Sequence, residues 1–400
     1  MRFRCDAFEE YPSRHVTLKW SALMKSHLEM RQEFNFILIE EMCAGSIDAV
    51  NIQTQTQARR NIPPLHNSQM HVFYVNLPWI IDEKDYNCSS RSRAEWLSRG
   101  SVNVVQGTYF LASGTVFVML YVLCLIGMLR GGLLKIPCYC LMFFNGIVDM
   151  CDLGVGSFIA AYFHFIGAVF CSTVTVNWLA GHLVWSVWCG ASFNCIVLAF
   201  NRIVEMIPSV RRLRFLFRGK LLYTWMAISV FYMVIRPFVT RPIPYNTVIS
   251  AFIGSPMISD DLEWEISHYQ SFFLPIHNVT ILVILSAAYT VLCCYVLQMN
   301  HFYREGLERV QVQLFIQAFL ICSTTAVASS LYIYVEFFPA SRTVVIMANV
   351  VWQLSHGLHG FIYLIFNRVI RTEVFAIFRV SLRSSNFAIP NTVTAISNKQ

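Results

Sequence analysis

Apolar residues along this chain gather into long runs, and polar residues concentrate before, between and after them. A membrane-spanning helix needs about 20 consecutive, predominantly apolar residues, because each residue advances the helix by about 1.5 Å. The interiors of the runs contain three charged residues, Asp149, Asp152 and Arg236. The pattern therefore predicts seven membrane-spanning segments, at residues 104–129, 136–161, 172–203, 220–240, 272–299, 311–335 and 343–366.

The fourth segment is the least regular of the seven. Arg236 and Pro237 interrupt its outer end, and the residue before a proline is disfavoured in a helix. Residues 245–258 offer a rival short span, but they contain Gly254 and Pro256, and we interpret them as a loop. The predicted fold class is an all-α membrane protein, built as a bundle of seven transmembrane helices.

The segments that flank the predicted bundle, at 101–367, have a different texture. Residues 1–100 are rich in charges of both signs, and their longest apolar run, residues 36–39, cannot span a bilayer. Beyond the seventh span, apolar residues recur at helical spacing, which predicts a short amphipathic helix at 368–383 on the inner leaflet. These apolar residues are Ile370, Val374, Phe375, Ile377 and Phe378. We expect residues 384–400 to form a disordered cytoplasmic tail.

Composition and charge agree with a membrane protein. The 400 residues are 56% hydrophobic and 13% charged, against about 25% charged residues in soluble domains. The net charge of +7 does not indicate a nucleic-acid partner, because the basic residues lie in loops and not on a soluble domain.

The basic residues are distributed unequally between the two sides of the predicted bundle. One set of loops, together with the C-terminal tail, holds fourteen of them: Arg130, Lys135, Arg211, Arg212, Arg214, Arg218, Lys220, Arg304, Arg309, Arg368, Arg371, Arg379, Arg383 and Lys399. After the first span, the opposite loops hold Arg241 and Arg342. Loops rich in Lys and Arg stay in the cytoplasm. We therefore expect the N-terminus, with residues 1–100, outside the cell and the C-terminus inside.

Several short motifs occur at defined places in these segments. The third segment ends Leu198-Ala-Phe-Asn201-Arg202-Ile-Val-Glu205, which resembles the Asp-Arg-Tyr element of rhodopsin-like receptors. The other motifs are Tyr86-Asn-Cys-Ser89 with Trp96 before the first span, Gly107 within it, Lys135-Ile-Pro-Cys-Tyr139 and Asp149 in the second, Gly181 and Trp188 in the third, and His356-Gly-Leu-His359-Gly-Phe-Ile-Tyr363-Leu-Ile-Phe-Asn367 in the seventh. Together they look like the Srt class of nematode serpentine chemoreceptors, over about residues 86–383.

The resemblance implies a G-protein-coupled chemosensory receptor. Such a receptor lies in the plasma membrane, here of a sensory neuron, binds an external small molecule and signals through a heterotrimeric G protein. Two departures stand out: the seventh span lacks the proline of the usual Asn-Pro-x-x-Tyr motif, and the second outer loop has no cysteine for the usual bridge to the third span. Residues 1–70 have no counterpart in the resemblance. We expect residues 1–70 to be a disordered tail or an extension of the gene model.

The resemblance also implies a set of signalling residues. Asp149 matches the aspartate of the second span that faces the seventh, often around a sodium ion, and His356 or His359 is its expected neighbour. Asn201 and Arg202 match the G-protein-facing switch, and Tyr363 matches the tyrosine of the seventh span. Arg202 is expected to pair with Glu205 or Glu308 in the inactive state. The alternatives are a structural polar contact for Asp149 and an inside-positive anchor for Arg202. Asp152, one turn from Asp149, is expected to line a watery cavity.

A ligand pocket is predicted in the outer half of the bundle. Residues Asn177, Gly181, Trp188, Cys195 and Arg202 share one face of the third span. Trp178, His182 and Trp185 form a second stripe that faces either the bundle or lipid. We predict a pocket lined by Trp185, Trp188, Trp352 and His356, the alternative being that these residues only pack the bundle.

Two covalent features are predicted on the outer side. The second outer loop has no cysteine, so an outer disulfide would draw on Cys5, Cys43, Cys88 and Cys171. We favour Cys88 with Cys171, and the alternative is that Cys171 is a buried thiol. Asn87-Cys-Ser89 is a candidate glycosylation site, and Asn278-Val-Thr280 is a second sequon too close to the membrane for use.

Other classes of function fit the sequence less well. A ligand-gated channel or a transporter with seven spans is the alternative, but transporters usually show internal repeats, and none is apparent here. An intramembrane enzyme would need a nucleophile with its base or converging metal ligands, and we find neither in the sequence. We expect membrane lipids as partners and predict no cofactor.

Overall fold

The computed structural model describes residues 74–269, 271, 273–302, 309–338 and 340–386. In this part of the chain, six helices are long and apolar enough to cross a membrane. They are α4 (Val104–Arg130), α5 (Pro137–Leu153) with its continuation to Ile166, α7 (Val174–Met206), α8 (Lys220–Val239), α10 (Phe273–Phe302) and α11 (Arg309–Phe337). Each overlaps the corresponding predicted segment over most of its length.

The seventh helix of the bundle is α12 (Arg342–Phe366), which lies where the seventh span was predicted. It is less apolar than the others because it carries Asn349, Gln353, His356 and His359, all of them buried. A helix enclosed by its neighbours can hold such residues, since they meet protein groups and not lipid. The chain therefore folds as a seven-helix membrane bundle.

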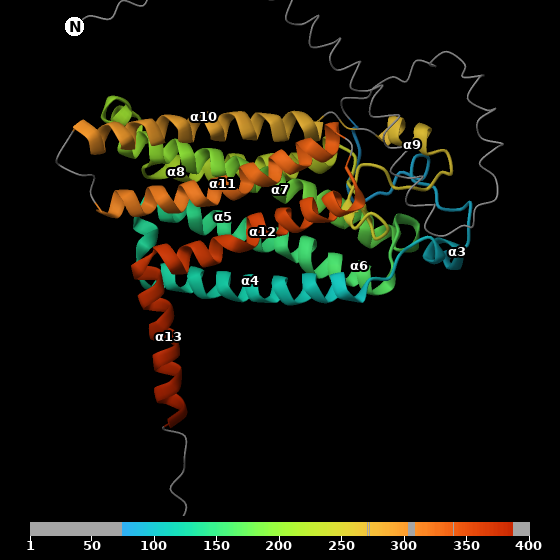
Figure 1. Ribbon diagram of the computed structural model, residues 1–400, viewed down its shortest axis with the longest axis horizontal. Helices are drawn as coiled ribbons and strands as arrows, with labels where there is room; N and C mark the ends of the chain where they lie inside the picture. The colour runs from blue at the N-terminus through green and yellow to red at the C-terminus, as the bar shows by residue number, and fades with distance from the viewer. Residues whose placement is uncertain (1–73, 270, 272, 303–308, 339, 387–400) are drawn as a thin grey trace, which may run out of the picture.

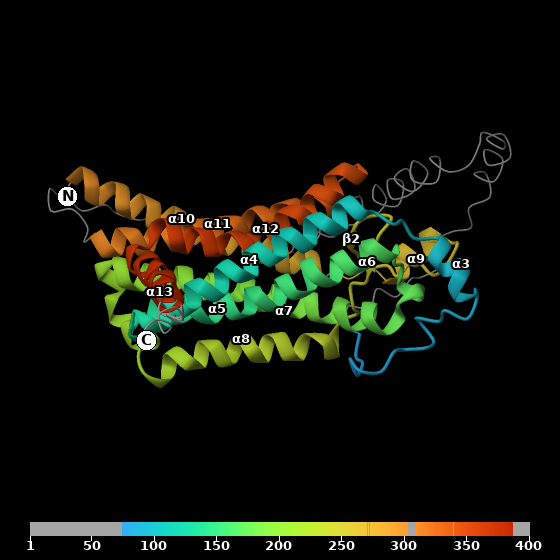
Figure 2. The ribbon, with the colours of Figure 1, turned by 90° about the horizontal axis from the view of Figure 1, so that it is seen from below.

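The long helices run side by side along the long axis of the molecule (Figures 1 and 2). Helix α7 is central and packs against α5, α8, α10 and α11. Protein buries 78% of its most apolar window, against 17% for α8, which lies at one edge of the bundle in Figure 2. The inward residues of α7 are therefore the best placed to connect the other helices.

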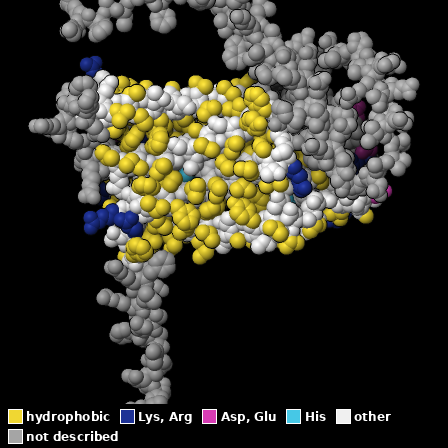
Figure 3. All heavy atoms as spheres, in the orientation of Figure 1, with side chains coloured by type: hydrophobic (Ala, Val, Ile, Leu, Met, Phe, Trp, Pro, Cys, Tyr) yellow, Lys and Arg dark blue, Asp and Glu magenta, His cyan; other side chains and the backbone are white. Residues whose placement is uncertain are grey.

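The surface of the bundle is mainly apolar on the face seen in Figure 3. Hydrophobic side chains cover the broad middle of this face, and Lys and Arg side chains border it towards both ends. Acidic side chains are seen only beyond it, on the side of α3 (Arg93–Ser98) and α9 (Leu262–Tyr269). A broad apolar zone between polar ends is the surface that a bilayer requires.

A π-helical turn, Gly154–Ile159, connects α5 to α6 (Ala160–Ile166). A Cβ atom on Gly156 would lie 2.7 Å from an atom of the Trp352 ring. Only glycine therefore lets Trp352 of α12 lie against the backbone here. Single π turns inside α-helices are common at functional sites, and this turn is next to Asp152.

The loop predicted at residues 245–258 contains two short strands. Strands β1 (Tyr245–Asn246) and β2 (Ala251–Phe252) pair in antiparallel register. The side chain of Asn177 on α7 fixes β1, because its Oδ1 accepts a hydrogen bond from the Tyr245 N–H at 2.6 Å and its Nδ2 donates to the Tyr245 carbonyl at 2.9 Å. With α3 and α9, this hairpin covers one end of the bundle (Figure 1).

Helix α13 (Arg368–Asn386) leaves the opposite end of the bundle and turns sharply away from its long axis (Figure 1). The side chain of Asn367 caps it by accepting hydrogen bonds from the N–H groups of Val369 and Ile370, both at 3.1 Å. Ile370 and Val374 are buried beside Gly127 of α4. The predicted amphipathic helix is thus tied to the bundle through its first turns.

Two predicted segments fall partly or wholly beyond the described residues. The extension at residues 1–70 lies outside them, and so do residues 387–400 of the predicted tail. Residues 384–386, which we assigned to that tail, form the end of α13 instead.

Candidate functional site

A buried carboxylate, Asp149, lies in the middle of the bundle on α5. Its side chain is fully buried, and two histidines of α12 approach it from one face of that helix. His356 Nδ1 lies 2.7 Å from Asp149 Oδ1, and His359 Nδ1 lies 2.9 Å from Asp149 Oδ2. Residues at i and i+3 lie on the same side of a helix, so both imidazoles reach a single carboxylate.

Two further side chains complete this centre, and the sequence analysis did not identify either of them. The hydroxyl of Tyr121 on α4 and the amide nitrogen of Asn145 on α5 each lie 2.7 Å from Asp149 Oδ2. Asn145 was detectable, because it precedes Asp149 by four residues on the same helix. Tyr121 gave no such signal, since only the fold places α4 beside α5.

The geometry around Asp149 does not fit the sodium ion that the resemblance suggested. Four hydrogen-bonding side chains already occupy both oxygens of the carboxylate. In the described part of the chain, no group of three or more His, Cys, Asp or Glu residues is arranged to hold a metal ion. A cation would have to displace one of the four partners first.

The polar centre extends from Asp149 to a second carboxylate and to a third helix. His356 Nε2 lies 3.4 Å from Asp152 Oδ2, so one imidazole bridges two carboxylates. His359 Nε2 lies 3.1 Å from the Thr324 hydroxyl of α11. Asp152 was predicted to line a watery cavity, but it is buried and is not part of the cavity wall described next.

An aromatic cavity lies in the half of the bundle next to the hairpin. Its walls come from α7, α10, α11, α12 and β2 with the segment before β1: Val184, Trp185, Trp188, Ile243, Phe252, Leu274, Asn278, Tyr332 and Trp352. The space free of protein atoms between these walls is about 370 Å³, a volume that includes open solvent. An apolar wall with few polar groups is typical of small-molecule sites.

The structure brings three of the four predicted pocket residues, the three tryptophans, to this wall. His356 is the exception and does not line the cavity. Its ring instead makes edge-to-face contacts with Trp188 and Trp352, at centroid distances of 5.7 and 5.8 Å. His356 therefore touches two walls of the cavity and also binds Asp149.

The stripe of Trp178, His182 and Trp185 does not face lipid. All three side chains are buried, because the segment before α3 and the end of α8 cover them. Trp178 Nε1 donates to the Pro78 carbonyl at 2.8 Å. Lipid exposure was a reasonable alternative because tryptophan is enriched at membrane interfaces, and only the tertiary contacts exclude it.

At the other end of α7, Arg202 is buried, and no acid among the described residues pairs with it. Its Nη2 donates to Asn201 Oδ1 at 2.5 Å, and its Nε and Nη1 have no hydrogen-bond partner among the described residues. Glu205 pairs with Arg214 at 2.8 Å, which corrects the first predicted pairing. The other candidate, Glu308, lies outside the described residues.

Tyr363, the remaining predicted switch residue, is fully buried between α12 and α5. Its hydroxyl donates to the Met142 carbonyl at 3.3 Å, and its ring meets that of Tyr121 edge to face at 6.2 Å. Because Tyr121 also contacts Asp149, Tyr363 is one side chain removed from the polar centre.

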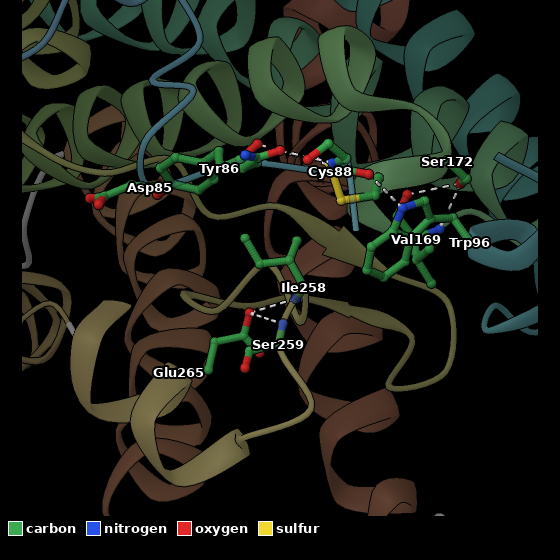
Figure 4. Close-up of a disulfide and its surroundings, with 12 residues drawn as sticks. Asp85, Tyr86, Cys88, Trp96, Val169, Ser172, Ile258, Ser259 and Glu265 are labelled. Carbon is green, nitrogen blue, oxygen red and sulfur yellow. Dashed lines mark hydrogen bonds between the residues drawn. A yellow bond between two sulfur atoms is a disulfide. The ribbon is translucent and has the colours of Figure 1, made fainter. Parts of the chain in front are cut away.

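A disulfide joins Cys88 to Cys171 at the end that carries the hairpin, with Cα atoms 5.5 Å apart. Figure 4 shows this bond beside Tyr86, whose buried ring packs against Phe170 and Trp178. Burial raises the pKa of the Tyr86 phenol. The bridge thus fastens the segment before α3 over the first turns of α7.

The two sequons differ in accessibility. Asn87 is exposed, and its side chain accepts a hydrogen bond from the Ser89 N–H at 2.8 Å. Asn278 is buried, and its Oδ1 accepts a hydrogen bond from Trp188 Nε1 at 3.0 Å. Only the first of them is open to a modifying enzyme.

Comparison with known proteins gives two findings. The model of the family described as serpentine type 7TM GPCR chemoreceptor Srt matches residues 70–386. Serpentine receptor class T-55 of Caenorhabditis elegans is 22% identical to this chain over 323 residues, which cover 78% of this chain and 87% of the relative.

Proposed function

Because this chain belongs to the Srt family of serpentine seven-transmembrane chemoreceptors, we propose that it binds an external small molecule in the aromatic cavity and signals through a heterotrimeric G protein. The members of this family are G-protein-coupled chemoreceptors. The ligand site, the direction of the signal and the G-protein contact are the parts that the proposal adds.

The observation that carries the proposal is the position of His356. The imidazole touches Trp188 and Trp352 of the cavity wall and binds Asp149 of the polar centre. A ligand that moves either tryptophan therefore changes the packing around this histidine. Such a ligand shifts the receptor towards its active state only if it binds that state more tightly than the inactive one.

The inner end of α7 is the proposed site of contact with the G protein. Arg202 lies on the same helix as Trp185 and Trp188, and two of its three nitrogens lack partners among the described residues. A buried guanidinium of this kind is ready to accept a new partner when the helices move apart. The basic segment Pro208–Phe217 follows directly and suits anionic lipid headgroups or an acidic protein surface.

We assign the N-terminus to the outside of the cell and the C-terminus to the cytoplasm. The excess of Lys and Arg at the α13 end supports this orientation. The disulfide and the exposed Asn87 sequon support it independently, because disulfides persist in oxidising compartments. In this orientation the cavity lies in the outer half of the bundle and α13 lies along the inner leaflet. We propose the plasma membrane of a sensory neuron as the location of the receptor.

The proposal is tested by expressing the full chain with a tag at each end and recording second-messenger responses to pools of small volatile and water-soluble compounds. A response that is lost in Arg202→Ala and kept in Arg368→Ala, with the N-terminal tag accessible on intact cells, supports it. Arg368 is an exposed arginine at the same end of the bundle and controls for loss of positive charge.

Two results would contradict the proposal. One is a ligand-evoked ionic current that persists when the G proteins are inhibited, which would favour the channel alternative. The other is an N-terminal tag that reacts only after the cells are permeabilised.

A further inference from the structure

A buried guanidinium, Arg236, lies near the outer end of α8 with no acidic partner in the described structure. Its side chain is 1% exposed. The three nitrogens of its guanidinium, Nε, Nη1 and Nη2, have no hydrogen-bond partner among the described residues. No described Asp or Glu forms an ion pair with Arg236. Removing a charge from water without pairing it costs several kcal/mol, so a group like this is unusual unless a partner binds from outside the chain.

Aromatic rings surround the cation and replace only part of its hydration. The guanidinium carbon lies 4.4 Å from the centroid of the Trp185 ring and 3.7 Å from that of Phe273. Contacts with rings use the face of the guanidinium and leave its five N–H donors unmet. The thiol of Cys189 is close enough to interact with it, but a thiol is a weak acceptor.

The unmet donors are next to the aromatic cavity. Trp185 is at the same time a wall of the cavity and the ring over which Arg236 lies. Leu274, which follows Phe273 in the chain, lines the cavity as well. One indole ring therefore separates the guanidinium from the cavity, and a ligand that passes the edge of this ring reaches the N–H groups.

A second donor lies in the wall of the cavity itself. Asn278 lines the cavity, and its Oδ1 is taken by the indole N–H of Trp188. An indole nitrogen can only donate, so the assignment of Oδ1 and Nδ2 is fixed. The Nδ2 group then remains a donor without a partner among the described residues. The Asn278 amide and the Arg236 guanidinium are therefore both available to donate hydrogen bonds to an acceptor on the ligand.

The other charged groups of the bundle interior argue against a cationic ligand. Asp149 and Asp152, the two buried carboxylates of the membrane-spanning helices, are both in contact with His356, and Asp149 also contacts His359. The acids therefore have basic partners within the chain, whereas Arg236 has no acid.

We propose that the cavity takes a small organic acid, whose apolar body lies among the tryptophans and whose carboxylate binds the guanidinium of Arg236. This inference rests on the proposed function, because it names the chemical class of the ligand for the same cavity. Carboxylates accept two parallel hydrogen bonds from a guanidinium, and the aromatic walls bury the rest of the molecule. A lipid headgroup does not reach Arg236, because protein covers the side chain.

The test uses the full receptor purified in detergent and measures its thermal unfolding with matched compounds. The probes are 3-phenylpropanoate and octanoate, each beside its neutral primary amide, and 3-phenylpropylamine as the cation. We expect the two acids to raise the unfolding temperature by a few degrees and the amides and the amine to leave it unchanged. In Arg236→Met the shift by the acids is lost, whereas in Arg368→Ala, which also removes one positive charge, it is kept.

Three results would overturn the inference. These are equal shifts by acids and amides, an undiminished shift by the acids in Arg236→Met, and no shift by either acid up to its solubility limit. The comparison of acid with amide on the unmodified receptor needs no variant, so it decides the matter even if Arg236→Met does not fold. Signalling by other compounds that depends on Arg202 would keep the proposed function while rejecting acids as its ligands.

Discussion

Asp149 and Arg236 are both buried charges in membrane-spanning helices, yet their surroundings are opposite. Asp149 meets four hydrogen-bonding side chains from α4, α5 and α12. Arg236 meets aromatic rings and has no hydrogen-bond partner among the described residues. The first charge is stabilised by the chain alone, which suits a centre that holds helices in one arrangement. The second lacks a partner, which suits a site for a ligand.

A nearby arginine makes the comparison sharper. Arg241, five residues after Arg236, also lies over aromatic rings, at 4.3 Å from Tyr74 and 5.0 Å from Tyr269. In addition it pairs with Asp85 at 2.7 Å. At Arg241, the ring contacts are thus accompanied by a carboxylate partner. The missing carboxylate distinguishes the environment of Arg236 from that of Arg241.

The largest expected effect comes from removing the satisfied charge. Asp149→Ala leaves two imidazoles, a phenol and an amide without their common partner, and we expect it to lower the free energy of unfolding by about 3–5 kcal/mol. Thermal unfolding of the purified receptor measures the loss. Asp149→Asn keeps one acceptor oxygen and should lose less. Equal stability of Asp149→Ala and the unmodified receptor would mean that the polar centre does not hold α4, α5 and α12 together.

The next effect tests the paired arginine. Arg241→Met leaves the carboxylate of Asp85 without its cation, and we expect a loss of about 1.5–3 kcal/mol. A double-mutant cycle with Asp85→Asn separates the ion pair from the ring contacts, because the second substitution should cost little once the first is present. Additive losses would show that the two side chains do not stabilise one another.

Arg236→Met is expected to change stability in the opposite direction. Removing an unpaired buried charge relieves its desolvation, and this gain exceeds the lost ring contacts, which contribute about 2 kcal/mol when desolvated. The empty receptor should therefore become more stable, by on the order of 1 kcal/mol. The same thermal unfolding, without added ligand, measures it beside Arg241→Met. A clear loss of stability in both variants would remove the distinction between the two arginines.

The smallest effect concerns an exposed ion-pair cluster at the end of the bundle that carries α3 and α9. Asp260 accepts hydrogen bonds from Arg99, at 2.9 Å, and from Arg91, and these bonds hold the pKa of its carboxyl below the usual value. A depressed pKa means that the stabilisation is present at neutral pH and is lost as the pH falls through the folded-state pKa.

Because Asp260 is largely exposed, we expect Asp260→Asn to cost less than about 1 kcal/mol at pH 7. The difference from the unmodified receptor should disappear in acid. Unfolding temperatures measured from pH 7 down to the acid limit of the receptor would reveal it. A difference that grows towards low pH would contradict the assigned sign.

The sequence predicted the residues at the core of the polar centre but not all of the side chains that bind Asp149. The family resemblance implied that Asp149 faces the seventh span with His356 or His359 beside it, and both imidazoles make this contact. Tyr121 was not foreseen, because its role depends on how α4 rotates against α5. Of the two acids predicted for Arg202, Glu205 pairs with Arg214 instead, and Glu308 lies outside the described residues.

The residues of the cavity wall were also predicted only in part. Three tryptophans were predicted to line it, and they do, because large aromatic residues on the inward face of a buried helix have few other places to lie. Phe252 and Ile243 come from a segment interpreted as a plain loop, and their positions follow from Asn177 binding the backbone of Tyr245. Such side-chain to backbone contacts leave no periodic trace in the sequence.

The sequence by itself determined the membrane-spanning helices, their approximate limits and the family motifs, because these depend on local apolarity and spacing, which are properties of consecutive residues. The tertiary structure alone decided which charges are satisfied. Asp149, Arg236 and Arg241 look alike in a sequence, as charged residues in or beside apolar segments. Whether each finds hydrogen-bond partners depends on residues far away in the chain, and the cost of leaving a buried charge unpaired makes that difference the one that matters for function.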